Sequence, residues 1–122
     1  MAVETPDSVP SQDLLGIRVH AFTVDTLLST IASVISEDRK AIIANVNANA
    51  MNLAAAKPWF RDFLNRAEFV FCDGSGVLLA ARLLGEPLPE RITYADWLPD
   101  LAGFCAERGF SLYLLGAKPG VA

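Results

Sequence analysis

The chain has 122 residues, 52% of them hydrophobic and 20% charged, and this composition excludes intrinsic disorder for most of the length. Such a length suffices for one modest domain with a hydrophobic core. The net charge of −4 argues against a nucleic-acid partner, because binding to a phosphate backbone needs clustered Lys and Arg.

Residues 1–13 predict a flexible tail that precedes a single domain over residues 14–122. Prolines, serines and acidic residues give this tail nothing to bury. It also lacks the basic start and apolar centre of a signal peptide, and no apolar run in the chain approaches the roughly 20 residues that span a bilayer. We therefore expect a cytoplasmic protein, in which Cys72 and Cys105 are buried, reduced thiols.

The first half of the domain predicts two strands, each followed by helical sequence. Residues 14–22 have strand character, and Thr23 can cap an amphipathic helix over residues 24–35. Residues 41–46 form a short apolar run typical of a strand buried on both faces. Good helix formers follow over residues 49–56.

A further helical piece begins at Pro58, and its aromatic stripe, which includes Trp59 and Phe63, predicts packing against the core. Residues 68–72 then predict a third strand, which the sequence continues into a helix over residues 77–84.

The last predicted helix runs to about Arg108 and stops at Gly109. Thr93 or Asp96 can cap it, and Pro99 favours Asp96 because the proline then falls in the first turn. A final strand is predicted over residues 111–116. The alternation of strands and helices predicts an α/β fold in which a parallel sheet is flanked by helices in a Rossmann-like arrangement.

Ligands of open parallel sheets bind beyond the carboxyl ends of the strands, so the residues directly after each predicted strand are site candidates. Amides follow the second strand, a carboxylate and glycines follow the third, and a glycine-containing loop follows the last. These residues are Asn45, Asn47, Asn49, Asn52, Asp73, Gly74, Gly76, Gly116, Lys118, Pro119 and Gly120.

Each candidate has a functional and a structural interpretation. Asp73 can act as a general base or as the N-cap of the next helix. Gly74 and Gly76 either let backbone approach a diphosphate or simply form a tight turn. The asparagines can bond sugar hydroxyls or a uracil edge, or they can cap a helix, as Asn47 is placed to do.

Two further polar residues lie outside these strand ends. Arg91 is either a phosphate clamp or a solvated loop residue. His20 is interpreted as a structural histidine that is satisfied within the core, since it is the sole histidine of the chain and cannot build a zinc site by itself.

In combination, these motifs resemble one known family. The run "NVNANAMNLA", then "FVFCDGSGVLLAARLLGEPLPERIT", then "LYLLGAKPGVA" is similar to the bacterial WecG/TagA/CpsF glycosyltransferases over roughly residues 14–122. The resemblance implies an inverting transferase that moves an N-acetylhexosamine, of the N-acetylmannosamine type or its uronic acid, from a UDP-sugar. The implied acceptor is an undecaprenyl-diphosphate-linked sugar in cell-surface polysaccharide or teichoic acid biosynthesis.

The resemblance also implies roles by position. Asp73 matches the family's proposed catalytic base, Asn47 its active-site asparagine, and Arg91 an arginine of the site. Gly116, Pro119 and Gly120 fall in the nucleotide-side loop, and Asn45 stands where many members have threonine, which implies hydrogen bonding to substrate. No DxD pair is present, so we expect no metal cofactor and a leaving diphosphate stabilised by helix N-termini and basic side chains.

The family resemblance further implies a domain that continues beyond Ala122, so the chain is expected to be truncated at its C-terminus. It also implies contact with the inner face of the plasma membrane. An exposed sheet edge can pair between copies of the chain, so a homo-oligomer is one expectation. The alternatives are a non-catalytic, Rossmann-like nucleotide-binding module and an inactive fragment. An NAD-binding fold is disfavoured because Leu79 replaces the third glycine of GxGxxG.

Overall fold

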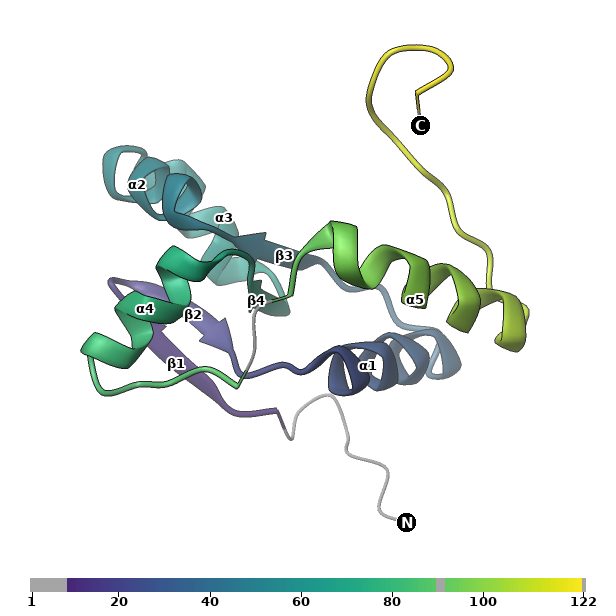
Figure 1. The fold of residues 1–122 in the computed structure, drawn as a ribbon, viewed down its shortest axis with the longest axis horizontal. Helices are drawn as coiled ribbons and strands as arrows, with labels where there is room; N and C mark the ends of the chain where they lie inside the picture. Colours follow the sequence, from purple (N-terminus) through teal and green to yellow (C-terminus); the bar gives the residue numbers. More distant parts are fainter. Residues whose placement is uncertain (1–8, 90–91, 122) are drawn as a thin grey trace.

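The computed structural model describes residues 9–89 and 92–121, which form a mixed α/β fold (Figure 1). In chain order the elements are β1 (Ser11–Leu14), β2 (Ile17–His20), α1 (Val24–Ser36), β3 (Ile43–Val46), α2 (Ala48–Ala56), α3 (Pro58–Arg66), β4 (Phe69–Cys72), α4 (Ser75–Leu83) and α5 (Tyr94–Arg108). The alternation of strands and helices, and the parallel pairing of β3 with β4, confirm the predicted Rossmann-like class.

The N-terminal strand region is a hairpin, not the single strand predicted over residues 14–22. β1 and β2 pair antiparallel with Leu14 opposite Ile17, which leaves a loop of only Leu15 and Gly16. Both loop residues have positive φ, 54° and 87°, as a two-residue type I′ turn requires. The prediction was wrong here because the glycine was not recognised as the second residue of a tight turn.

The hairpin also begins earlier than the predicted domain. Ser11 to Asp13, which were assigned to the flexible tail, pair with β2. The carboxylate of Asp13 accepts the backbone N–H of Gly16 at 3.0 Å, so an acidic residue of the expected tail helps to form the turn.

β3 and β4 form a parallel pair in which Ile43 lies opposite Phe69 and Val46 opposite Cys72. The crossover between them consists of α2 and α3, as expected because parallel strands need a long connection. Every residue of β4 is buried. The predicted strands at 41–46 and 68–72 are therefore confirmed to within two residues.

Helices cover both faces of this pair. One face packs against α2, α3, α4 and the hairpin, and the buried residues of this layer are Leu14, Ile17, Val19, Val46, Ala54, Leu64, Ala67, Val70, Cys72, Val77 and Ala81. The other face packs against α1 and α5, which lie side by side in Figure 1; its buried residues are Phe22, Leu27, Val34, Phe69, Phe71, Ile92, Trp97, Leu101 and Cys105. Alternate residues of β4 thus serve opposite layers.

On the edge of β4 that faces away from β3, backbone groups form hydrogen bonds although no strand is paired with that edge. His20 Nδ1 accepts the backbone N–H of Val70 at 3.1 Å, and the backbone N–H of Ile92 donates to the carbonyl of Cys72 at 3.1 Å. His20 is only 6% exposed, which confirms the structural interpretation of this histidine. The contact of Ile92 also brings the start of α5 to the carboxyl end of β4.

The helix ends follow local sequence in most places. Thr23 caps α1 in a reciprocal capping box with Thr26, and Asn47 caps α2. The start of α5 differs from the favoured prediction, because Thr93 precedes its first turn and Pro99 lies inside the helix. The Thr93 hydroxyl donates to the Asp96 carboxylate at 2.7 Å, so Asp96 supports the first turn without being the cap.

Two surface regions contradict the sequence analysis. Residues 111–116 form no strand; Tyr113 is 85% and Leu115 90% exposed. Figure 1 shows this segment leaving the far end of α5 and curving away from β3 and β4, so it finds no edge with which to pair. On α3, Leu64 is buried and Phe60 packs against the core, as predicted, but Trp59 is 66% and Phe63 40% exposed, so these two aromatic residues do not face the core.

Candidate functional site

The carboxyl ends of β3 and β4 form a rim at which three helices begin. Asn47 leads from β3 into α2, Gly74 leads from β4 into α4, and Ile92 holds the start of α5 against Cys72. The positive ends of these helix dipoles therefore face one region of the surface. We define this region as the rim; it is where the sequence predicted a site.

Asp73 is the half-buried carboxylate of the rim. Its backbone N–H donates to the carbonyl of Val46 at 2.8 Å, so the parallel hydrogen-bonding pattern continues one residue beyond β4. Because side chains alternate along a strand, Asp73 lies on the same face as Phe71, and Asn45 lies opposite Phe71 in the register. The structure thereby brings two predicted site residues together.

The Asn45 side chain links Asp73 to helix α5. Its amide nitrogen Nδ2 donates to Asp73 Oδ2 at 3.0 Å, and its amide oxygen Oδ1 lies 3.5 Å from the hydroxyl of Tyr94. The sequence analysis missed Tyr94. The sequence marks Tyr94 only as the residue directly after Thr93, the N-cap of α5. Its nearness to β3 follows from the packing of α5 and is visible only in the structure.

The Tyr94 hydroxyl remains protonated at neutral pH. Burial raises the pKa of Tyr94, and the negative charge of Asp73 raises this pKa further. Its ring is 6.1 Å from the ring of Phe71 and 5.7 Å from that of Trp97, measured between centroids. An aromatic cluster therefore places a phenol donor beside the Asn45 amide.

The glycines after β4 allow α2 and α4 to begin close together. Gly74 has φ of 97°, a left-handed conformation that favours glycine. A Cβ atom at Gly76 would lie 3.4 Å from Cβ of Ala48, the first residue of α2. The tight-turn interpretation is confirmed for Gly74, whereas Gly76 lies in the first turn of α4, where it allows the close approach to α2. The contact of either glycine with a diphosphate stays a prediction.

Asn47 also has the structural role that was weighed for it. Its side-chain oxygen accepts the backbone N–H of Ala50 at 2.8 Å, which is a helix cap. The side chain is exposed at the rim. Its role toward a substrate stays a prediction.

The predicted nucleotide-side loop is not brought to Asp73. Gly116, Pro119 and Gly120 lie in the exposed segment beyond α5, which curves away from the strands (Figure 1). Arg91 lies outside the described residues. The predicted contribution of the loop at 116–120 to the rim therefore has no counterpart in this arrangement of the chain.

Cys72 lies next to Asp73 but on the opposite face of β4. Burial, with a further contribution from the Asp73 charge, raises the pKa of the Cys72 thiol to about 11. The thiol donates to the carbonyl of Gly74 at 3.6 Å. Because the thiol stays protonated at neutral pH, it is a core side chain and not a nucleophile of the rim.

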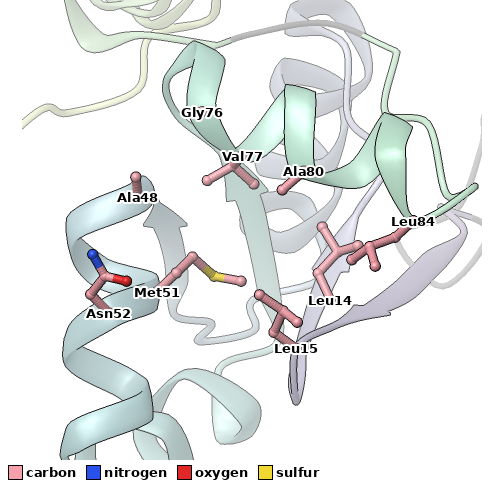
Figure 2. Close-up of a pocket in the computed structure, with 9 residues that line it drawn as sticks. All are labelled: Leu14, Leu15, Ala48, Met51, Asn52, Gly76, Val77, Ala80 and Leu84. Atoms are coloured by element: carbon pink, nitrogen blue, oxygen red, sulfur yellow. The ribbon is translucent and has the colours of Figure 1, made fainter.

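An apolar groove borders the rim between α2, α4 and the hairpin turn. Figure 2 shows Met51 and Leu15 pointing toward one another across it, with Ala48 and Gly76 at the end nearest the rim. Its volume is about 170 Å³. Its lining residues are Leu14, Leu15, Ala48, Met51, Asn52, Gly76, Val77, Ala80 and Leu84. Asn52 supplies the polar side chain of this lining.

Two kinds of feature are absent from the part of the chain that the structure describes. In residues 9–89 and 92–121, no helix has both the length and the apolarity needed to cross a membrane. The same residues contain no group of three or more His, Cys, Asp or Glu side chains placed to hold a metal ion.

Comparison with known proteins agrees with the resemblance noted in the sequence. The profile of the "Glycosyl transferase WecG/TagA/CpsF family" matches residues 12–122. Relatives from Staphylococcus aureus strains NCTC 8325, COL and MRSA252 are each 24% identical over 119 residues, which is 96% of this chain and 47% of the relative. Each is named N-acetylglucosaminyldiphosphoundecaprenol N-acetyl-beta-D-mannosaminyltransferase. The chain thus spans about half the length of these curated relatives.

Proposed function

The chain belongs to the WecG/TagA/CpsF glycosyltransferase family, and from this premise we propose that it is an inverting transferase of an N-acetylhexosamine. The proposed donor is a UDP-sugar of the N-acetylmannosamine type. The proposed acceptor is an undecaprenyl-diphosphate-linked sugar, since the name of the S. aureus relatives specifies a lipid-linked N-acetylglucosamine. The reaction would then take place at the inner face of the plasma membrane, in the synthesis of a cell-surface polymer.

The observation that carries this proposal is the place of Asp73. It stands at the end of a buried parallel strand, half-buried, oriented by an amide and surrounded by the starts of three helices. A carboxylate in this position can accept a proton from an acceptor hydroxyl within the site.

The proposed chemistry is a single displacement. Asp73 takes the proton of the acceptor hydroxyl, and the hydroxyl oxygen forms a bond to the anomeric carbon of the donor sugar. The bond from that carbon to the UDP oxygen breaks, and UDP leaves with the electron pair, which inverts the anomeric configuration. A general base of this kind contributes typically about 10²–10⁴-fold to the rate.

Stabilisation of the leaving UDP is assigned to backbone groups and to Arg91. Helix N-termini carry the positive end of the helix dipole and favour an anion, and α2 and α4 both begin at the rim. Gly74 and Gly76 let these two helices begin close together, so that both N-termini lie at the same part of the rim. We propose that the reaction proceeds without a metal ion, because the chain contains no DxD pair to hold one.

Transfer of labelled sugar tests the proposal. The chain is incubated with radiolabelled UDP-N-acetylmannosamine and undecaprenyl-diphosphate N-acetylglucosamine, and label in the extracted lipid is counted. We expect transfer by the unmodified chain and a loss of about 10²–10⁴-fold in Asp73→Asn. Asp62→Asn, which alters an exposed carboxylate of α3, is the matched control and should transfer normally.

Binding measurements distinguish the ways in which the proposal could fail. UDP binding by calorimetry should be retained in Asp73→Asn. Normal transfer by this variant would remove Asp73 as the base. UDP binding without transfer, in a chain shown to be folded, would instead favour the non-catalytic nucleotide-binding module, and preferential binding of NAD would contradict both readings.

A further inference from the structure

We propose that Asn45 and Tyr94 are positioning residues for the Asp73 carboxylate, with Tyr94 fixing the orientation of the Asn45 amide and the amide fixing the carboxylate. The inference rests on the proposed function, because it assigns a purpose to this contact in the transfer reaction. Neither residue needs to touch the reacting atoms for this role. Tyr94 is a residue to which nothing in the sequence assigned a function.

The first step of the argument is the direction of the Asn45 amide. An ionised carboxylate can only accept hydrogen bonds, so the amide nitrogen must face Asp73, and the observed distance of 3.0 Å between Nδ2 and Oδ2 agrees. The amide oxygen must then point away from Asp73. If the amide were rotated by half a turn, two oxygens would face each other and the bond would be lost.

The second step is what holds the amide in this direction. The Tyr94 hydroxyl, which is protonated at neutral pH, can donate to the outward-pointing Oδ1, from which it is 3.5 Å away. The phenol O–H can donate to Oδ1 when the amide nitrogen faces Asp73. In the reverse orientation the O–H would face the amide NH₂ group, which cannot accept, so the phenol stabilises the observed orientation. The distance is long for a hydrogen bond, and such contacts in unliganded sites shorten when substrate is bound.

The third step is the rigidity of the tyrosine itself. Its ring lies against Phe71 of β4 and Trp97 of α5, with centroids at 6.1 Å and 5.7 Å. The start of α5 is tied to β4 through the bond from Ile92 to Cys72. The tyrosine ring is thus held against β4 and α5 on one side, while 45% of the residue stays exposed at the rim.

The consequence for catalysis is that the two carboxylate oxygens of Asp73 have different roles. Asn45 engages Oδ2. We therefore expect Oδ1 to receive the proton of the acceptor hydroxyl. Loss of orientation would leave substrate binding intact and reduce the fraction of productive encounters, and a misplacement of about 1 Å can cost about 10²-fold in rate.

A double-mutant cycle in the transfer assay tests the inference. We expect kcat to fall about 10-fold in Tyr94→Phe and about 10²-fold in Asn45→Ala, with KM for both substrates unchanged. In the Asn45→Ala background, Tyr94→Phe should have no further effect, because the tyrosine acts through the amide. Tyr113→Phe, at an exposed tyrosine beyond α5, is the matched control. Asn45→Leu replaces the alanine variant if that variant does not fold.

A second measurement is independent of activity. The Asn45 side-chain NH₂ signals, observed by NMR in the unliganded chain, should shift in Tyr94→Phe and stay unchanged in Tyr113→Phe. Unchanged signals, a normal kcat in Tyr94→Phe, or additive losses in the cycle would each overturn the positioning role. Failure of the proposed function looks different, because then the unmodified chain does not transfer or Asp73→Asn transfers normally.

Discussion

His20 Nδ1 accepts the backbone N–H of Val70 at 3.1 Å, so a side chain of the hairpin satisfies a backbone donor on the edge of β4 that faces away from β3. Nδ1 can accept only when it is unprotonated, so this contact requires a neutral imidazole. The ring also lies 5.4 Å from the ring of Phe69, between centroids. Protonation of His20 would therefore place a charge in the core and break a bond to β4.

The free energy of unfolding should consequently fall in mild acid. Burial lowers the pKa of His20 below its ordinary value of 6.5, and the nearby Arg18 lowers it further. Above pH 6.5 both folded and unfolded chains hold a neutral imidazole; as the pH falls, the unfolded chain binds the proton first, so stability is lost. Urea unfolding at pH 7, 6 and 5 checks this. His20→Asn, whose amide oxygen can still accept, should show a shallower decline; an equal decline would contradict the assignment.

A methyl group should have opposite effects at two glycines. Gly74→Ala places a side chain at φ of 97° and should lower the free energy of unfolding by about 1–3 kcal/mol. Gly103→Ala, on the exposed side of α5 with no neighbouring atom within 4 Å of the added carbon, should raise it by up to about 1 kcal/mol. Urea titration of both variants provides the comparison. Equal effects would mean that the turn after β4 is not strained.

Cys72 should resist alkylation in the folded chain. Its thiol pKa of about 11 exceeds the ordinary value of about 8.5, so its thiolate fraction at pH 8 is on the order of 10²-fold below that of an exposed cysteine. Iodoacetamide labelling followed by mass spectrometry should show slow modification of Cys72, and urea should abolish the protection. Rapid labelling without denaturant would mean that β4 opens readily.

Transfer should not depend on a metal ion. The proposed stabilisation of UDP uses helix N-termini and Arg91, so treatment with EDTA should leave turnover unchanged. The assay is that of the labelled lipid, run with and without added Mg²⁺. Activity that disappears with EDTA and returns with Mg²⁺ would show that the diphosphate needs a cation.

Features set by neighbouring residues were predictable from the sequence. The cap at Thr23, the strand at 41–46 and the helix stop at Gly109 each depend on a few adjacent side chains, and the structure contains all three. The same applies to the nearness of Asn45 and Asp73. Asn45 lies near the carboxyl end of β3 and Asp73 directly follows β4, and the carboxyl ends of parallel strands meet at one edge of a sheet.

Features set by distant contacts were not predictable. Residues 111–116 have the composition of a strand, but a strand requires a neighbouring strand with which to pair. The sequence does not show how far from β3 and β4 the C-terminal end of α5 lies. Tyr94 reaches Asn45 only because α5 packs on the face of β4 that carries Phe71. The hairpin turn was recognisable in principle, through a glycine directly before the apolar residues of β2.

Within the described part of the chain, β3 is hydrogen-bonded to β4 along one edge only. The other edge of β3 can pair with a further strand. A segment that pairs with β3 in parallel runs toward the same end of the sheet as β3. A strand added in parallel at this edge would end beside the carboxyl end of β3, next to Asn45. The outer edge of one short strand is therefore where a further segment would extend the rim.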